Sequence, residues 1–296
     1  MPTRALVLSG GGPIGIAWES GIAAGMAEAG VMLGDADYIL GTSAGSFVGA
    51  QLASGRDPRS LVAAQLARAE GGTRAAPENR APAPDLSGLM SQMMKLYTSD
   101  GPPEEARVEI GKFALDAQTL SEEAFINTFG RMPEEWPEHR FACTAVDTAN
   151  GSFQIWNNDS GVSLPRAVAS SCSVPGVYPP ITVNGRRYMD GGMRSGTNAD
   201  FAKGYQRVLV VIVRAGAASA APAGGMNMAE ISQKRLDAEL RVLRDSGSAV
   251  ELLIPDADSA AAMGVNLMSF SARGAAVEAG IAQGKVEAER LRNFWV

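Results

Sequence analysis

Gly41-Thr42-Ser43-Ala44-Gly45 is the stretch that decides the fold. The apolar run 38–40 before it is typical of a buried strand, and residues 46–52 after it carry small and apolar side chains at helical spacing. A G-x-S-x-G pattern between a strand and a helix indicates a nucleophile elbow, a turn so tight that only glycine is tolerated beside the serine. Such a turn pushes the serine hydroxyl out of the sheet and directs a helix N-terminus at any anion formed there. The sequence therefore predicts a reactive serine at position 43.

A similar strand, loop and helix precede the elbow. Residues 4–9 are apolar and β-prone, the loop Gly10-Gly11-Gly12-Pro13-Ile14-Gly15 follows, and residues 16–30 form a mostly apolar helix with small residues for close packing. The other expected elements are hairpins at 141–156 and 181–189, helices at 164–171, 229–246 and 272–293, and strands at 207–213 and 250–254. Alternation of strands and helices at the N-terminus favours a parallel sheet covered by helices.

Residues 58–130 are expected to form a helical cap inserted between sheet strands. Within them, residues 70–84 are rich in Ala, Pro, Gly and Arg without periodicity, which predicts a mobile loop. Apolar residues recur at three- and four-residue spacing over 86–97, which predicts an amphipathic helix. Its stripe includes Met90, Met93 and Met94, which either pack on the core or line an adaptable acyl-chain pocket.

Composition limits the function classes. The 296 residues are compatible with one large α/β domain, and the net charge of -6 gives no general reason to expect nucleic acid as a partner. Cys143 and Cys172 lie far apart and have neither metal nor redox spacing, so reduced thiols and a cytoplasmic location are expected. The apolar run 5–8 is too short for a signal peptide, and no segment approaches a transmembrane span. Any membrane contact would be peripheral.

The glycine loop permits two functions. Gly10, Gly12 and Gly15 match the dinucleotide-binding fingerprint, but that site also needs an acidic residue where the second strand ends, and the Gly41 turn occupies this position. Alternatively, consecutive glycines offer unobstructed backbone N–H groups to an oxyanion beside Ser43. Dinucleotide binding stays open as an alternative.

A serine nucleophile needs a base, and the chain has a single histidine. His139 lies at the front of a predicted strand, where a surface or strand-edge role is expected, so the base is expected to be a carboxylate. Asp190 ends a strand and is followed by Gly191-Gly192, which lets the backbone turn away and leave the carboxylate exposed in a cleft. Taken alone, the triplet is also compatible with an aspartate of an ordinary hairpin turn.

Three blocks in this order together resemble the patatin-like phospholipases: the loop 10–15, the elbow 41–45 and Asp190-Gly191-Gly192. The run 169–180 also fits, and Asn198 falls where the family often has asparagine. The resemblance covers about residues 4–213. It implies Ser43 as nucleophile, Asp190 as base, and the N–H groups of Gly11 and Gly12 as oxyanion donors. Elbow geometry adds Ala44 N–H as a further donor, while the turns are supported by Gly10, Gly15, Gly41, Gly45, Gly191 and Gly192.

The resemblance implies a three-layer α/β/α fold with a central, mainly parallel sheet and a single domain over 1–296, completed by residues 214–296. It further implies a serine lipid acyl hydrolase that needs neither cofactor nor metal, takes a lipid or acyl-ester substrate, and makes at most transient peripheral contact with a membrane. Ile14 departs from the family, which usually has Arg or Lys there, so a preference for phosphate-bearing lipids does not follow. A non-catalytic lipid- or protein-binding module on the same fold is the alternative.

Overall fold

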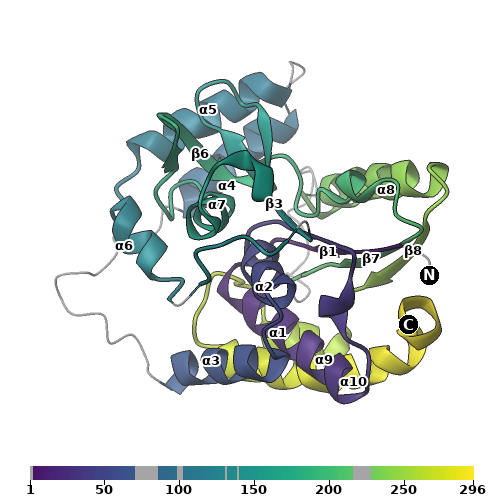
Figure 1. The fold of residues 1–296 in the computed structure, drawn as a ribbon. Helices are drawn as coiled ribbons and strands as arrows, with labels where there is room; N and C mark the ends of the chain where they lie inside the picture. The colour runs from purple at the N-terminus through teal and green to yellow at the C-terminus, as the bar shows by residue number, and fades with distance from the viewer. Residues whose placement is uncertain (1–2, 71–85, 99–102, 131, 139, 216–227) are drawn as a thin grey trace.

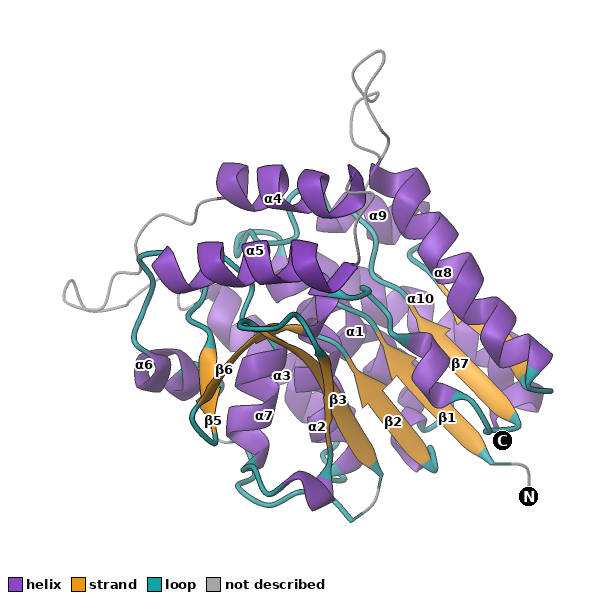
Figure 2. Cartoon of the chain, turned by 90° about the horizontal axis from the view of Figure 1, so that it is seen from above, coloured by secondary structure: helices purple, strands orange, loops and turns teal. Residues whose placement is uncertain are grey.

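A central sheet organises the computed structural model, which describes residues 3–70, 86–98, 103–130, 132–138, 140–215 and 228–296 (Figures 1 and 2). In this described part the sheet has eight strands, in the order β5-β6-β3-β2-β1-β7-β8 with β4 also paired to β3. The strands are β1 (Arg4–Leu8), β2 (Tyr38–Gly41), β3 (Phe141–Asp147), β4 (Phe153–Trp156), β5 (Ile181–Val183), β6 (Arg186–Asp190), β7 (Arg207–Val211) and β8 (Ala249–Leu253). The pairs among β1, β2, β3, β7 and β8 are parallel and those of β4, β5 and β6 antiparallel, so the mainly parallel sheet is confirmed.

Helices cover both faces of the sheet. They are α1 (Gly12–Glu28), α2 (Ala44–Ala53), α3 (Pro58–Glu70), α4 (Leu86–Thr98), α5 (Pro103–Asp116), α6 (Glu122–Asn127), α7 (Leu164–Ser171), α8 (Met228–Asp245), α9 (Ala257–Met263) and α10 (Arg273–Trp295). Alternate side chains of β1 divide between two cores: Leu6 packs in the core formed with α1, α2, α7 and α10, whereas Val7 packs with Leu240 of α8. Burial on both faces is typical of parallel strands and gives the three-layer fold.

The N-terminal and C-terminal parts of the chain pack tightly through α1 and α10. A Cβ atom at Gly25 of α1 would lie 2.2 Å from the backbone oxygen of Ile281 and 3.1 Å from the Cα of Gly284 in α10. The two helices therefore approach as closely as their backbones allow, which explains the small residues along α1. Helix α1 begins at Gly12 rather than at residue 16, so the second half of the glycine loop forms its first turn.

The expected cap at 58–130 is divided between two places. Helix α3 packs against α1 and α10, and Phe125 of α6 belongs to the same core, whereas α4 and α5 lie on the opposite face, where Ile110 contacts Val146 of β3 (Figure 1). The expected loop 70–84 falls almost entirely outside the described residues. Ser121 separates α6 from α5, because its Oγ accepts a hydrogen bond from Ala124 N–H at 3.2 Å and caps the new helix.

Both expected hairpins are present. In the second one, Asn184 and Gly185 have φ values of 50° and 77°, the geometry that joins two twisted strands through a two-residue turn. This hairpin pairs β6 with β3, so that Asp190 lies opposite Ala145 at the end of β6. Helix α9 was not expected from the sequence. None of the helices in the described ranges is long and apolar enough to span a bilayer.

Candidate active site

Ser43 lies at a sharp turn between β2 and α2. Its φ is 51° and its ψ is -116°, a backbone conformation that non-glycine residues rarely adopt. The turn lies directly on neighbouring backbone: a Cβ at Gly45 would lie 2.2 Å from Leu8 O, and one at Gly41 would lie 2.4 Å from the Cα of Ser46. Neighbouring backbone atoms leave no room for a side chain at either glycine of the G-x-S-x-G pattern. This is the packing that a nucleophile elbow requires.

The end of α7 anchors the backbone of Ser43. Ser43 N–H donates to Ser171 Oγ at 3.0 Å, and Ser43 O accepts from Ser46 Oγ at 2.6 Å and from Cys172 Sγ at 3.1 Å. These contacts fix the strained turn through backbone atoms. Sequence reasoning singled out the run 169–171 without assigning it a role, and it missed Cys172 as a neighbour of the serine.

Asp190 is buried rather than exposed in a cleft, with 2% of its surface accessible. The pairing of β6 with β3 and the turn at Gly191 enclose it, which corrects the sequence expectation. Gly192 N–H donates to Oδ1 at 2.7 Å, while the buried Oδ2 has no well-formed hydrogen bond among the described residues. The turn thus holds one of the two carboxylate oxygens in place.

Burial raises the pKa of Asp190 to about 7. The side chain of Ser43 and the N–H of Gly192 oppose this rise, because both favour the charged carboxylate through hydrogen bonding. The Ser43 hydroxyl therefore lies close enough to Asp190 to influence its ionisation, although the geometry of a full hydrogen bond is not reached. Such loosely aligned pairs are common in sites without substrate.

Two helices begin beside the serine. The Cβ position of Gly10 is 3.4 Å from the Cβ of Ser43, and Gly12 and Ala44, the first residues of α1 and α2, line the same pocket as Ser43. Two helix N-termini with their partial positive charge thus meet beside the hydroxyl. Ile14, which stands where the family usually has Arg or Lys, does not face this pocket. Its side chain is fully buried in the main core.

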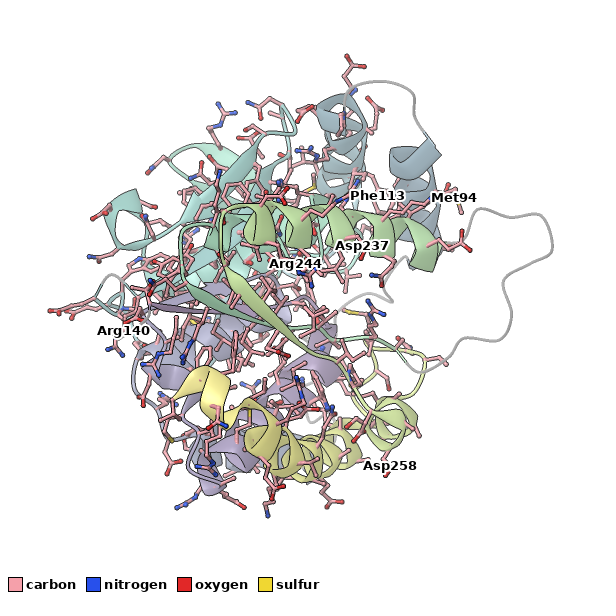
Figure 3. All side chains as sticks on the ribbon, turned by 90° about the vertical axis from the view of Figure 1, so that its right-hand side faces the viewer. Met94, Phe113, Arg140, Asp237, Arg244 and Asp258 are labelled. Atoms are coloured by element: carbon pink, nitrogen blue, oxygen red, sulfur yellow. The ribbon has the colours of Figure 1, made fainter. Side chains whose placement is uncertain are left out.

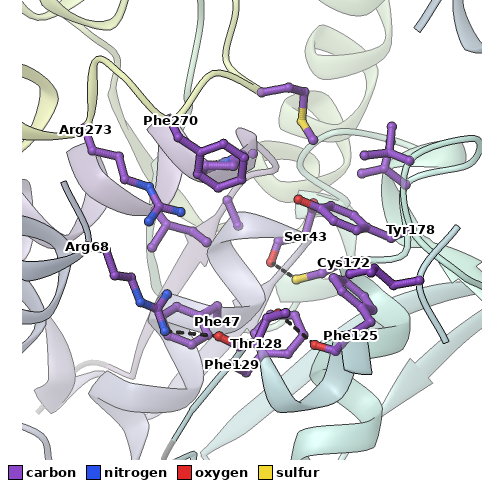
Figure 4. Close-up of a pocket in the computed structure, with 18 residues that line it drawn as sticks. Ser43, Phe47, Arg68, Phe125, Thr128, Phe129, Cys172, Tyr178, Phe270 and Arg273 are labelled. Carbon is purple, nitrogen blue, oxygen red and sulfur yellow. Dashed lines mark hydrogen bonds between the residues drawn. The ribbon is translucent and has the colours of Figure 1, made fainter. Parts of the chain in front are cut away.

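The pocket above Ser43 is a largely apolar cavity of about 370 Å³ (Figure 4). Its aromatic wall includes Phe125 and Tyr178, whose rings stack at 4.3 Å between centroids, and Phe129 packs edge-on against Phe125. Met268 and Phe270 come to the pocket from the segment before α10. Phe47 also lines it from α2, four residues after Ser43, and this helical spacing is the one signal that could have revealed a lining residue in advance.

Of the methionine stripe, the two side chains that the structure describes, those of Met93 and Met94, do not line this pocket. Met93 packs beside Ile110 and Val146 on the other side of the sheet, and Met94 is 37% exposed on the outer side of α4 (Figure 3). The side chain of Met90 lies outside the described residues. Of the two interpretations of the stripe, packing on the core describes Met93.

The structure describes an acidic residue beside β2 but not the single histidine of the chain. His139 lies outside the described residues. Asp37, which precedes β2, accepts a hydrogen bond from Arg4 N–H at 2.7 Å, so it is not available to a ribose at the strand's end. In the described part of the chain, no cluster of three or more His, Cys, Asp or Glu side chains could hold a metal ion.

Comparison with known proteins gives one family and one fold. The family model described as patatin-like phospholipase matches residues 6–203. The structure is similar to VipD from Legionella pneumophila with a TM-score of 0.50 at 14% identity, over 98% of this chain and 67% of VipD. The effector ExoU of Pseudomonas aeruginosa gives a TM-score of 0.40 at 17% identity over 98% of this chain, which spans only 54% of ExoU. No curated protein matches the sequence.

Proposed function

The chain belongs to the patatin-like phospholipase family, whose members hydrolyse lipid esters, and we propose that it is a serine lipid acyl hydrolase with a Ser43–Asp190 dyad. One observation carries this proposal: a buried carboxylate, whose pKa is raised to about 7, lies within reach of the hydroxyl of a serine on a strained elbow. An aspartate with an ordinary pKa near 4 is a poor base for a hydroxyl. Burial of Asp190 brings its basicity close to the working pH.

In the acylation step, Ser43 Oγ attacks the carbonyl carbon of the ester and its proton passes to Asp190 Oδ2. The tetrahedral intermediate places its negative oxygen against the N–H groups of Gly11, Gly12 and Ala44. Collapse of the intermediate breaks the ester bond, and the proton on Asp190 passes to the departing alkoxide. The product of this half-reaction is an acyl-enzyme on Ser43.

In the deacylation step, Asp190 takes a proton from water as that water attacks the acyl carbon. The same N–H groups bind the second oxyanion, and the proton then returns to Ser43 Oγ as the fatty acid leaves. No cofactor or metal is required by this sequence of steps. Gly10, Gly15, Gly41, Gly45, Gly191 and Gly192 serve as turn and elbow supports.

The apolar cavity suits the acyl chain of a lipid or acyl-ester substrate. We take residues 1–296 as one domain, since residues 214–296 supply β8 and α10, and α10 packs closely on α1. Both cysteines are free and buried, which supports a cytoplasmic location. Contact with a membrane is expected to be peripheral and transient.

Covalent labelling with a fluorophosphonate probe tests the dyad, because such probes react only with activated serines. Wild type is expected to be labelled, Ser43→Ala to lose labelling completely, and Asp190→Asn to label at least about 100-fold more slowly, in line with loss of a general base. Ser54→Ala is the matched control, since Ser54 lies just beyond α2 and its hydroxyl donates a hydrogen bond to Ala50 O of the same helix. A folded wild type that takes no label would favour a non-catalytic lipid- or protein-binding module.

A further inference from the structure

Two arginines from distant parts of the chain meet at one wall of the pocket that contains Ser43. Arg68 comes from the last turn of α3 and Arg273 is the first residue of α10, and both line the cavity. In Figure 4 their guanidinium groups lie one above the other on one side of Ser43, with Tyr178 and Phe125 on the other side. Arg273 is only 7% exposed, whereas Arg68 is exposed at the rim.

Within the part of the chain that the structure describes, neither arginine has a carboxylate partner to balance its charge. None of the ion pairs in the described ranges includes Arg68 or Arg273, although other arginines of the chain have such partners, as Arg194 does with Asp200 at 2.7 Å. Arg273 Nε is buried without a hydrogen-bond partner, and its guanidinium lies 4.7 Å from the ring centroid of Phe270. Arg68 Nη2 donates to Thr128 O at 3.2 Å. Arg68 also lies 5.9 Å from the ring centroid of Phe47, so these contacts of the two guanidinium groups are with aromatic rings and a neutral carbonyl.

This arrangement is unfavourable without a ligand. Burial, together with a smaller effect of the nearby charge of Arg68, lowers the pKa of Arg273 to about 10. Arg273 nevertheless keeps its charge at neutral pH. A buried cation without a counter-charge destabilises the folded protein, and a second cation beside it adds repulsion. An anion bound between the two would remove both penalties through charge-assisted hydrogen bonds.

We propose that Arg68 and Arg273 form an anion subsite for the phosphate of the substrate, so that the preferred ester carries phosphate on its alcohol portion. The proposal rests on the hydrolase function of Ser43. Guanidinium groups match the oxygens of phosphate in bidentate geometry, and the remaining wall of the cavity is apolar, as an acyl chain requires.

A matched pair of substrates tests this selectivity: a 1-acylglycerol 3-phosphate and the 1-acylglycerol with the same acyl chain. Wild type is expected to show a kcat/KM at least about tenfold higher for the phosphate ester. Arg273→Gln and Arg68→Gln should each lower the ratio of the two kcat/KM values about tenfold or more, as loss of a hydrogen bond to a charged group does. Arg59→Gln, which removes an exposed charge from the start of α3, is the control and should keep the wild-type ratio. A wild-type ratio near one, or a ratio that neither pocket variant changes, would overturn the subsite.

A binding experiment separates the subsite from the chemistry. Dodecyl phosphate is titrated calorimetrically into the full chain with Ser43→Ala, alone and combined with Arg273→Gln or Arg59→Gln. Arg273→Gln should weaken binding about tenfold or more and Arg59→Gln should not. Equal affinity in all three proteins would overturn the subsite while leaving hydrolysis intact. Arginine-dependent binding in a protein that hydrolyses no ester would keep the subsite and remove the proposed function.

Inorganic phosphate distinguishes a lipid phosphate from a free one. Millimolar phosphate should compete weakly with dodecyl phosphate, because the apolar wall contributes only to binding of the chain. Competition at the affinity of dodecyl phosphate itself would overturn the assignment to a lipid.

Thermal unfolding checks that the variants fold. Arg273→Gln removes an unpaired buried charge, so its Tm should equal or exceed that of wild type. Should that variant unfold, Arg68→Gln at the exposed rim carries the test.

Discussion

Asn198 Nδ2 lies 3.1 Å from Thr42 Oγ1 and donates a hydrogen bond to it, which ties the residue before Ser43 to the segment that follows Asp190. The same amide donates to Gly191 O at 3.3 Å and is completely buried, with a φ of 51°. One side chain therefore contacts both the elbow and the aspartate turn. We infer that Asn198 is a positioning residue that sets the distance between the serine and the carboxylate.

Asn198→Ala is expected to lower kcat about 10- to 100-fold with a smaller effect on KM, because small displacements of reacting groups are costly. It should also reduce the free energy of unfolding by about 2–4 kcal/mol, since buried acceptors lose their donor. Steady-state kinetics and thermal unfolding measure the two effects. Asn184→Ala is the control. Asn184 has a φ of 50° in an exposed hairpin turn, so this variant changes an asparagine with the same backbone strain but without the hydrogen bonds that Asn198 makes to Thr42 and Gly191. Unchanged kcat in Asn198→Ala would contradict the positioning role.

The pH dependence of the reaction should report Asp190. Because burial raises the pKa of this carboxyl to about 7 and the base must be unprotonated, kcat/KM should fall about tenfold per pH unit below 7 and level off above it. A neutral acylglycerol is the suitable substrate, since it has no ionisation of its own in this range. A profile that stays flat down to pH 5 would exclude Asp190 as the base.

Asp190→Asn should stabilise the protein at alkaline pH while it removes activity. The pKa of Asp190 is raised on folding, so the stability it contributes is full below its unfolded pKa near 3.8 and is lost as the pH rises through about 7. Each pKa unit corresponds to about 1.4 kcal/mol. Wild type should therefore lose stability relative to Asp190→Asn between pH 4 and pH 7, with the largest difference in Tm above pH 7.

Gly45→Ala should disrupt the elbow, because the new methyl group would lie 2.2 Å from the backbone oxygen of Leu8 in β1. A central strand cannot move aside, so we expect a loss of about 3 kcal/mol or more of stability, together with loss of fluorophosphonate labelling. Denaturant unfolding and labelling measure these effects. Gly196→Ala is the matched control, since nothing lies within 4 Å of its Cβ position and the Ser43 turn is left unchanged. A stable, fully labelled Gly45→Ala protein would refute the close packing of the elbow.

Local sequence was sufficient where local geometry decides the structure. The elbow at Ser43 was predictable because glycine spacing between a strand and a helix determines the turn, and the hairpin at Asn184-Gly185 was predictable because both residues tolerate positive φ. The start of α1 was missed by four residues, since Pro13 suits the first turn of a helix and does not break it. The spacing of the apolar residues around Met93 predicted a helix correctly. Such spacing does not determine which part of the protein the apolar face contacts, and Met93 packs beside Ile110 and Val146.

The sequence by itself determined the mainly parallel α/β sheet, the place of Ser43 on a strand-to-helix turn and the resemblance that selects Asp190. Tertiary structure alone decided that Asp190 is buried, since burial depends on the pairing of β6 with β3 and not on the residues beside it. It also brought Arg68 and Arg273 to one pocket through the packing of α3 and α10. Charge and desolvation act through space, so neither the basicity of the aspartate nor an unpaired arginine is encoded in any short stretch of the chain.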